Sequence, residues 1–296
     1  MLRQINHLKL LARAARKIAN NPALFREALV YARNDLLSWF GVYRYDYPVI
    51  FIAGLPKSGT TWLETQLVKV LGYNLRPIND PQGVTLNHDI CESVFSWLPE
   101  HGYSLIKLHT RYTDENFRII TKYCPKFIVM IRDLRDMCVS GYFHVKNNPE
   151  HCHYALYNQE SIETGLLHRI EITGHEYVPW VRNWLRVAEQ HPNEISLIRY
   201  EDLNKDPFTT FQKALEFYHL PVNEDFLQEL ENSKLKEQRD LKNELTKNTG
   251  SRLKSTARKG IVGDWHNYFT EANKAKFKQM SGDILVESGY EKDNNW

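Results

Sequence analysis

The stretch that most restricts the fold of this 296-residue chain runs from residue 48 to residue 72. It reads PVIFIAG, then LPKSGT, then TWLETQLVKVLG: an apolar run, a turn rich in hydroxyl residues and glycine, and a helical pattern that ends at a glycine. A turn of this kind between a strand and a helix favours phosphate binding, because the N–H groups and dipole of the helix start attract anions. The alternative is a plain connecting turn, but too many phosphate-binding residue types gather here to favour it.

The spacing in this turn is close to that of a Walker-type P-loop, G-x-x-x-x-G-K-[ST]. Gly54, Gly59 and Thr61 occupy the expected positions, but Thr60 replaces the lysine, and Lys57 stands three residues earlier. In nucleoside triphosphatases the lysine at the usual position reaches the β- and γ-phosphates, beside Mg²⁺. The moved lysine therefore argues against a P-loop kinase of a small molecule, which remains the alternative function.

Three further apolar runs, at 104–110, 126–132 and 195–201, are rich in Ile, Val and Leu without clean alternation. Such runs are typical of parallel strands that are buried on both faces. Helical patterns at 178–190 and 206–218 flank the last of these runs. Strands alternating with helices predict an α/β fold of three layers with a mainly parallel central sheet.

We expect a helical extension over 1–45 and a single domain over 46–296. Within that domain, 232–259 contains nine Lys or Arg against three acids, which predicts a basic lid that orders on binding. The net charge of the whole chain is only +2, so nothing points to a nucleic-acid partner. The segment LKLLARAARKIA at 8–19 predicts a packed amphipathic helix, with contact to an anionic membrane as the alternative.

The cysteines, the histidines and the hydropathy of the sequence indicate the cellular location of the protein and whether it binds a metal. The four cysteines form no C-x-x-C pair, as expected of a reduced cytoplasmic protein. The triplet HCH at 151–153 offers metal ligands, but no second cluster follows it, so no metal is expected. No apolar run approaches the ~18 residues that cross a bilayer.

Three motifs, in order, resemble those of the sulfotransferase family that uses 3′-phosphoadenosine 5′-phosphosulfate (PAPS), in its cytosolic small-molecule branch. They are PKSGTTW at 56–62, IRDLRDMCVSGYFH at 131–144 and RKGIVGDWHNYFT at 258–270. The resemblance covers about 48–270 and leaves the first 40 residues unmatched. It implies PAPS as the sulfuryl donor, a small-molecule acceptor and no metal.

The same resemblance implies a role for individual residues in donor binding. The 5′-phosphosulfate is expected to contact Lys57, Ser58, Gly59, Thr60 and Thr61. The 3′-phosphate is expected to contact Arg132, Ser140, Arg258, Lys259 and Gly260. The adenine is expected to contact Trp62, Tyr200 and Ser233. For Trp62 the alternative role is helix packing.

Catalytic roles follow from the segment IKLHT, which ends the predicted strand 104–110 and resembles a K-x-H segment of the family. Active-site residues of open α/β sheets lie at the carboxyl ends of strands. His109 is the expected general base, because imidazole is substantially neutral at pH 7. Lys57 is expected to stabilise the leaving oxygen and Lys107 the sulfuryl oxygens, during in-line attack by a hydroxyl or amine.

Acceptor and assembly are less determined. Aromatic residues around 78–103 and 142–157 suit a phenol or another flat acceptor, while Asp80, Asp89 and Glu92 leave a cationic acceptor open. The dimer motif of the cytosolic family aligns with four positions, of which only the threonine is kept: His266, Thr270, Glu271 and Ala275. We therefore expect a monomer or a different dimer.

Overall fold

A computed structural model describes residues 22–76, 78–222 and 260–296 of the chain. A parallel five-stranded sheet forms its centre, with strand order β2-β3-β1-β4-β5. The strands are β1 (Val49–Gly54), β2 (Tyr73–Leu75), β3 (Tyr103–Leu108), β4 (Phe127–Ile131) and β5 (Ile195–Arg199). The predicted α/β fold is confirmed. The short strand β2 was not predicted, because three residues are too few to form an apolar run.

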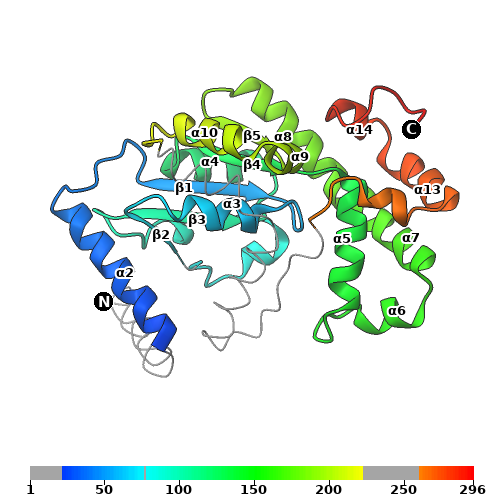
Figure 1. Ribbon diagram of the computed structural model, residues 1–296, viewed down its shortest axis with the longest axis horizontal. Helices are drawn as coiled ribbons and strands as arrows, with labels where there is room; N and C mark the ends of the chain where they lie inside the picture. Colours follow the sequence, from blue (N-terminus) through cyan, green and yellow to red (C-terminus); the bar gives the residue numbers. More distant parts are fainter. Residues whose placement is uncertain (1–21, 77, 223–259) are drawn as a thin grey trace.

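Helices cover both faces of this sheet, so that the fold has three layers (Figure 1). Alternate residues of β1 point to opposite sides: Phe51 packs with α4 and α8, and Ile52 packs with α3 and α10. The covering helices are α3 (Thr60–Leu67), α4 (Asp114–Tyr123), α8 (Val178–Gln190), α9 (Tyr200–Lys205) and α10 (Pro207–Phe217). Burial on both faces explains why these strands read as continuous apolar runs.

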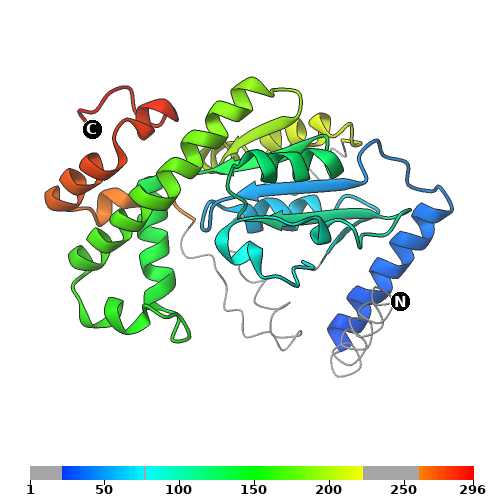
Figure 2. The same cartoon turned by 180° about the vertical axis from the view of Figure 1, so that it is seen from behind.

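A second group of helices lies beyond the carboxyl ends of the strands (Figures 1 and 2). It contains α5 (Leu134–Lys146), α6 (Tyr154–Gln159), α7 (Ile162–Ile172), α13 (Glu271–Ser281) and α14 (Ile284–Glu287). A π-helical turn, Thr173–Tyr177, joins α7 to α8. Short 3₁₀ turns occur at Val84–Asn87, Glu92–Val94 and Asp264–Asn267.

The remaining helix, α2 (Pro22–Trp39), lies at the β2 edge of the sheet (Figure 1). Asp35 forms an ion pair with Arg76 at 2.5 Å, and Asn34 donates a hydrogen bond to Asn74. These two contacts attach the helix to β2 and to the residue that follows it. No helix within the described ranges is long and apolar enough to cross a membrane. The helix expected at 8–19 and the lid expected at 232–259 lie outside these ranges, so the expected domain division stays a prediction.

Candidate active site

The turn after β1 has a backbone shape that few sequences can adopt. Lys57 and Gly59 have positive φ angles of 73° and 90°. A Cβ added to Gly54 would lie 2.2 Å from Cγ2 of Thr60, and the Ser58 hydroxyl donates a 2.7 Å hydrogen bond to the Leu55 carbonyl. The turn is thereby held in one conformation, as a preformed anion site requires.

Helix α3 begins directly at this turn. Its first helical hydrogen bonds run from the N–H groups of Trp62 and Leu63 to the carbonyl of Gly59. The N–H groups of Thr60 and Thr61 precede these bonds and belong to the helix-start donors that have no intrahelical acceptor. Together with the helix dipole they form a site that favours an anion such as a phosphate or sulfate.

The second motif enters the same region at the end of β4. Arg132 follows that strand and is only 8% exposed. Its guanidinium donates hydrogen bonds to the carbonyls of Lys57 (3.2 Å) and Ile261 (3.1 Å). The central carbon of the guanidinium, Cζ, lies 4.2 Å from the ring centre of Tyr200. Arg132 Nε finds no hydrogen-bond partner among the described residues. One side chain therefore joins the first motif to the third and keeps donor capacity for a ligand.

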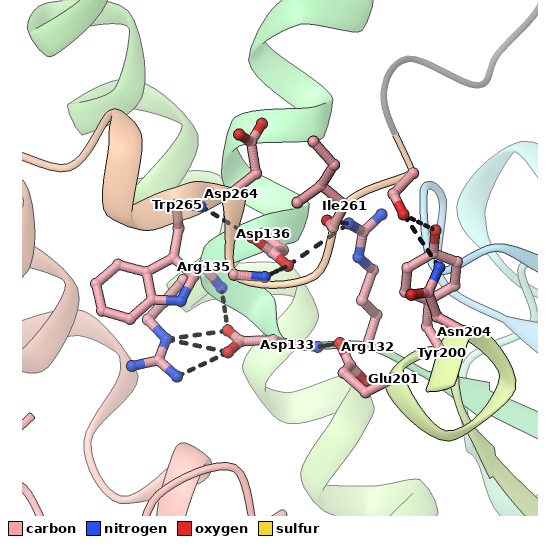
Figure 3. Close-up of polar contacts among 12 residues, drawn as sticks. Arg132, Asp133, Arg135, Asp136, Tyr200, Glu201, Asn204, Ile261, Asp264 and Trp265 are labelled. Atoms are coloured by element: carbon pink, nitrogen blue, oxygen red, sulfur yellow. Dashed lines mark hydrogen bonds and ion pairs between the residues drawn. The ribbon is translucent and has the colours of Figure 1, made fainter. Parts of the chain in front are cut away.

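Besides Arg132, three side chains fix the described part of the third motif, Gly260 onward (Figure 3). The Tyr200 hydroxyl and the Asn204 amide each donate a 3.1 Å hydrogen bond to the carbonyl of Gly260. The Asp136 carboxylate accepts from the N–H groups of Gly263 (2.8 Å) and Trp265 (3.0 Å). Residues more than a hundred positions apart are therefore brought together at the carboxyl end of the sheet.

Several residues of this network were missed from the sequence. Asp136 lies four residues after Arg132 on α5, and their side chains approach to 3.6 Å. Burial raises the pKa of Asp136, although the Arg132 charge and the two bound N–H groups oppose this. Next to it, Arg135 pairs with Asp133 at 2.7 Å and with Glu291 at 2.6 Å (partly drawn in Figure 3). The i,i+4 spacing in IRDLRD was the available signal for the Arg132–Asp136 pair.

His109 lies just beyond the end of β3, beside the first motif. Its Nδ1 lies 2.5 Å from the carbonyl oxygen of Gly54. A carbonyl can only accept, so Nδ1 carries the proton and Nε2 keeps its lone pair. Burial lowers the pKa of His109 to about 4, helped by the positive charges of Lys107 and Lys57 and opposed by the Gly54 hydrogen bond. The imidazole is therefore neutral at pH 7 and can accept a proton at Nε2.

The other sequence-predicted residues differ in how the structure places them. Lys107 lies on β3 with its ammonium 3.4 Å from the Glu64 carboxylate, and Ser140 is buried on α5. Trp62 is only 8% exposed and packs edge-on against Phe211, with ring centres 6.0 Å apart. Helix packing thus accounts for most of the Trp62 surface, and its adenine contact stays a prediction. Ser233, Arg258 and Lys259 lie outside the described residues.

One group of possible metal ligands is present in the described part of the chain. Ligand atoms of His151, Cys152 and His153 lie within 4.8 Å of one another. The Nδ1 atom of His151 already accepts the N–H of His153, so a metal at this atom, though not at Nε2, would displace a hydrogen bond. The sequence-based expectation of no metal stays an expectation.

The fold and the site define an α/β protein built around a phosphate-binding loop whose lysine is displaced from the Walker position. Residues 48–289 match the family model of the sulfotransferase domain, and the chain belongs to this family. It is 28% identical over 271 residues to Sulfotransferase 1B1 of Canis lupus familiaris, covering 80% of this chain and 84% of that protein. It is 26% identical over 248 residues to Cytosolic sulfotransferase 3 of Arabidopsis thaliana, covering 80% and 76% respectively.

Among solved structures, mouse sulfotransferase SULT7A1 complexed with PAP has the same fold, with a TM-score of 0.59 and 22% identity, covering 84% of this chain and 86% of that one. The family membership confirms the predicted sulfotransferase enzyme. The kinase alternative is not favoured.

Proposed function

We propose that the chain transfers the sulfuryl group of PAPS to a hydroxyl or amine of a small-molecule acceptor. The observation that carries this proposal is the meeting of the three motifs at the carboxyl ends of β1, β3 and β4, with the Nε2 lone pair of His109 beside the phosphate-binding turn. The complex of a structural neighbour with PAP, the desulfated donor, adds support.

In this proposal the two phosphates of the donor occupy different parts of the site. The 5′-phosphosulfate lies on the turn, where it contacts Lys57, Ser58, Gly59, Thr60 and Thr61. The 3′-phosphate lies against Arg132 and Ser140, with Arg258, Lys259 and Gly260 from the third motif. The guanidinium fork of Arg132 suits a phosphate, because it offers two parallel donors.

Transfer requires one proton acceptor and one stabilised leaving group. The acceptor O–H or N–H gives its proton to Nε2 of His109 while its oxygen or nitrogen bonds to sulfur. The bond between sulfur and the bridging oxygen breaks on the opposite side, and Lys57 stabilises the charge that develops on that oxygen. Lys107 stabilises the equatorial sulfuryl oxygens. The products are a sulfate ester or sulfamate and 3′-phosphoadenosine 5′-phosphate (PAP).

Location and assembly follow as further proposals. A cytoplasmic location is supported by relatives that are named cytosolic sulfotransferases. We also propose a monomer, or a dimer that does not use the family's segment. Light scattering should then give a mass near 34.9 kDa for the monomer. A mass twice as large, with a contact through residues 266–275, would contradict it.

Thermal shift tests donor binding without knowledge of the acceptor. PAP should raise the melting temperature in the absence of Mg²⁺, and Arg132→Met should reduce this shift. Arg182→Met is the matched control, since Arg182 pairs with Glu287 on the surface. A shift with ATP and Mg²⁺ but none with PAP would refute the proposal and favour a kinase.

A further inference from the structure

The helical group beyond the sheet contains a buried positive charge that has no negative partner among the described residues. Arg169, on α7, is only 8% exposed, and no ion pair among the described residues includes its guanidinium. Its Nε finds no hydrogen-bond partner in the described part of the chain, and the side chains that hydrogen-bond to its guanidinium, Tyr157 and Tyr177, are phenols and not carboxylates. A buried cation without an anion is costly, because desolvation is not offset by charge attraction.

The guanidinium of Arg169 has a specific position against α5. A Cβ added to Gly141 would lie 2.6 Å from Nη2 and 2.8 Å from Nε of Arg169. The absence of a side chain at Gly141 therefore lets the charge approach the backbone of α5. Gly141 directly follows Ser140, a predicted contact of the donor 3′-phosphate. Arg169 is thus next to the donor-binding helix rather than at the outer surface.

Arg169 and the turn after β1 both act on one histidine of α5. His144 lies about one helical turn beyond Gly141 on α5. The pKa of His144 is lowered to about 4, chiefly by burial and also by the positive charges of Lys57 and Arg169. Lys57 and Arg169 are thus each near enough to His144 for their charges to act on its imidazole. That imidazole is neutral at pH 7, so nothing in it offsets the charge of Arg169.

The three acidic residues that could have bound a cationic acceptor already have hydrogen-bond or ion-pair partners within the protein. The Asp80 carboxylate accepts from the N–H groups of residues 84 and 85 and from the hydroxyl of residue 85. Asp89 pairs with Arg111 at 2.7 Å, and Glu92 pairs with Lys122 at 2.9 Å. The positive charge of Arg169, in contrast, has no such partner in the described residues. The electrostatics of this region therefore favour a negatively charged acceptor over a cationic one.

We propose that the acceptor carries an oxyanionic group, such as a carboxylate, and that Arg169 binds this group while the acceptor hydroxyl or amine points toward the sulfuryl donor. This inference rests on the proposed sulfotransferase function and specifies the class of its acceptor. The guanidinium fork gives a carboxylate two parallel charged hydrogen bonds, and burial of the site strengthens them.

The test uses acceptors that differ only in charge. One phenolic set contains 4-propylphenol, 3-(4-hydroxyphenyl)propionate and tyramine, and an aliphatic set contains 1-hexanol, 6-hydroxyhexanoate and 6-aminohexanol. The wild-type enzyme should prefer the anionic member of at least one set. Arg169→Met should lower kcat/KM for that anion by about 10- to 100-fold and change the neutral member less than about threefold. Arg169→Lys should retain part of the preference, and Arg182→Met should retain all of it.

Binding provides a second measurement that does not need turnover. With PAP bound, 3-(4-hydroxyphenyl)propionate or 6-hydroxyhexanoate should raise the melting temperature of the wild type but not of Arg169→Met. The shift caused by PAP alone should be the same in both proteins.

Several outcomes would overturn the proposal. Equal transfer to neutral and anionic members, an equal loss on all acceptors in Arg169→Met, or transfer to no member while PAP still binds would each refute the anionic acceptor and leave the sulfotransferase function standing. A loss of PAP binding in Arg169→Met would assign Arg169 to the donor instead. Failure of the wild type to bind PAP would refute the proposed function itself.

Discussion

Replacing His109 with glutamine should make the stability of the protein less sensitive to acid. The pKa of His109 is lowered from 6.5 to about 4 in the folded protein, chiefly by burial. The unfolded chain therefore takes up this proton first as the pH falls. The contribution of neutral His109 to the free energy of unfolding is fully present above pH 6.5 and is lost progressively between pH 6.5 and pH 4. Glutamine does not titrate, and its amide can still donate to the Gly54 carbonyl.

The size of this effect follows from the two pKa values. A difference between 6.5 and about 4 corresponds to about 3 kcal/mol once the pH is below 4, and to about 2 kcal/mol at pH 5. His144, whose pKa is also lowered to about 4, contributes in both proteins. The comparison of wild type with His109→Gln at two pH values cancels that contribution.

Urea unfolding at pH 7.5 and pH 5.0 measures this directly. The wild type should lose about 2 kcal/mol more than His109→Gln between these pH values, or about 4–8 °C more in melting temperature. The exposed His101→Gln serves as the control for removing a histidine. Equal losses in wild type and His109→Gln would refute the buried neutral imidazole, and with it the reason for assigning Nε2 as the proton acceptor.

Three further predictions concern the same site. In Asp136→Asn the new amide can accept only one of the two N–H groups that the carboxylate now binds. The free energy of unfolding should therefore fall by about 1–3 kcal/mol, and PAP should bind less tightly. Unchanged values in urea unfolding and PAP titration would contradict this. Gly59→Ala should destabilise more than Gly83→Ala, since both have positive φ but only the former meets a tyrosine ring, 2.4 Å away; equal melting temperatures contradict it. His109→Ala should lower kcat by about 10²–10⁴-fold, and by less with phenols that are already ionised, whereas the loss of kcat in Lys57→Ala should persist with ionised phenols. If His109→Ala lowers kcat by the same factor for every phenol, His109 is not the general base.

The sheet could be predicted from the sequence because burial on both faces leaves a strong signal. The strands β1, β4 and β5 fall within the predicted apolar runs, and β3 begins one residue before its run. The helix predicted to extend to the glycine at 72 ends at Leu67 instead, because a turn with Gly72 at φ 93° leads into β2. A three-residue edge strand leaves no periodic signal, so neither β2 nor this early helix end could be read from the pattern.

The site could be predicted only where its residues are neighbours in the sequence. The turn after β1 and the arginine after β4 lie in contiguous motifs, and the structure brings them together. The contacts of Asp136 and Asn204 with the third motif could not be predicted, because they join residues that lie 127 and 56 positions apart. For Trp62 the sequence left two roles open, and the structure shows the packing role, because its ring is buried edge-on against Phe211, whereas the adenine contact stays a prediction.

If the 3′-phosphate of the donor binds at Arg132, as proposed, it would affect two segments of the site. The Arg132 guanidinium donates to the carbonyl of Lys57 in the turn after β1 and to the carbonyl of Ile261 in the third motif. A phosphate at Arg132 would compete for the same N–H donors and would attract them more strongly than neutral carbonyls do. Binding of the 3′-phosphate would therefore change the hydrogen bonding of both segments at once. Loss of the 3′-phosphate should accordingly affect the sulfuryl end of the site as well as the contact at Arg132 itself.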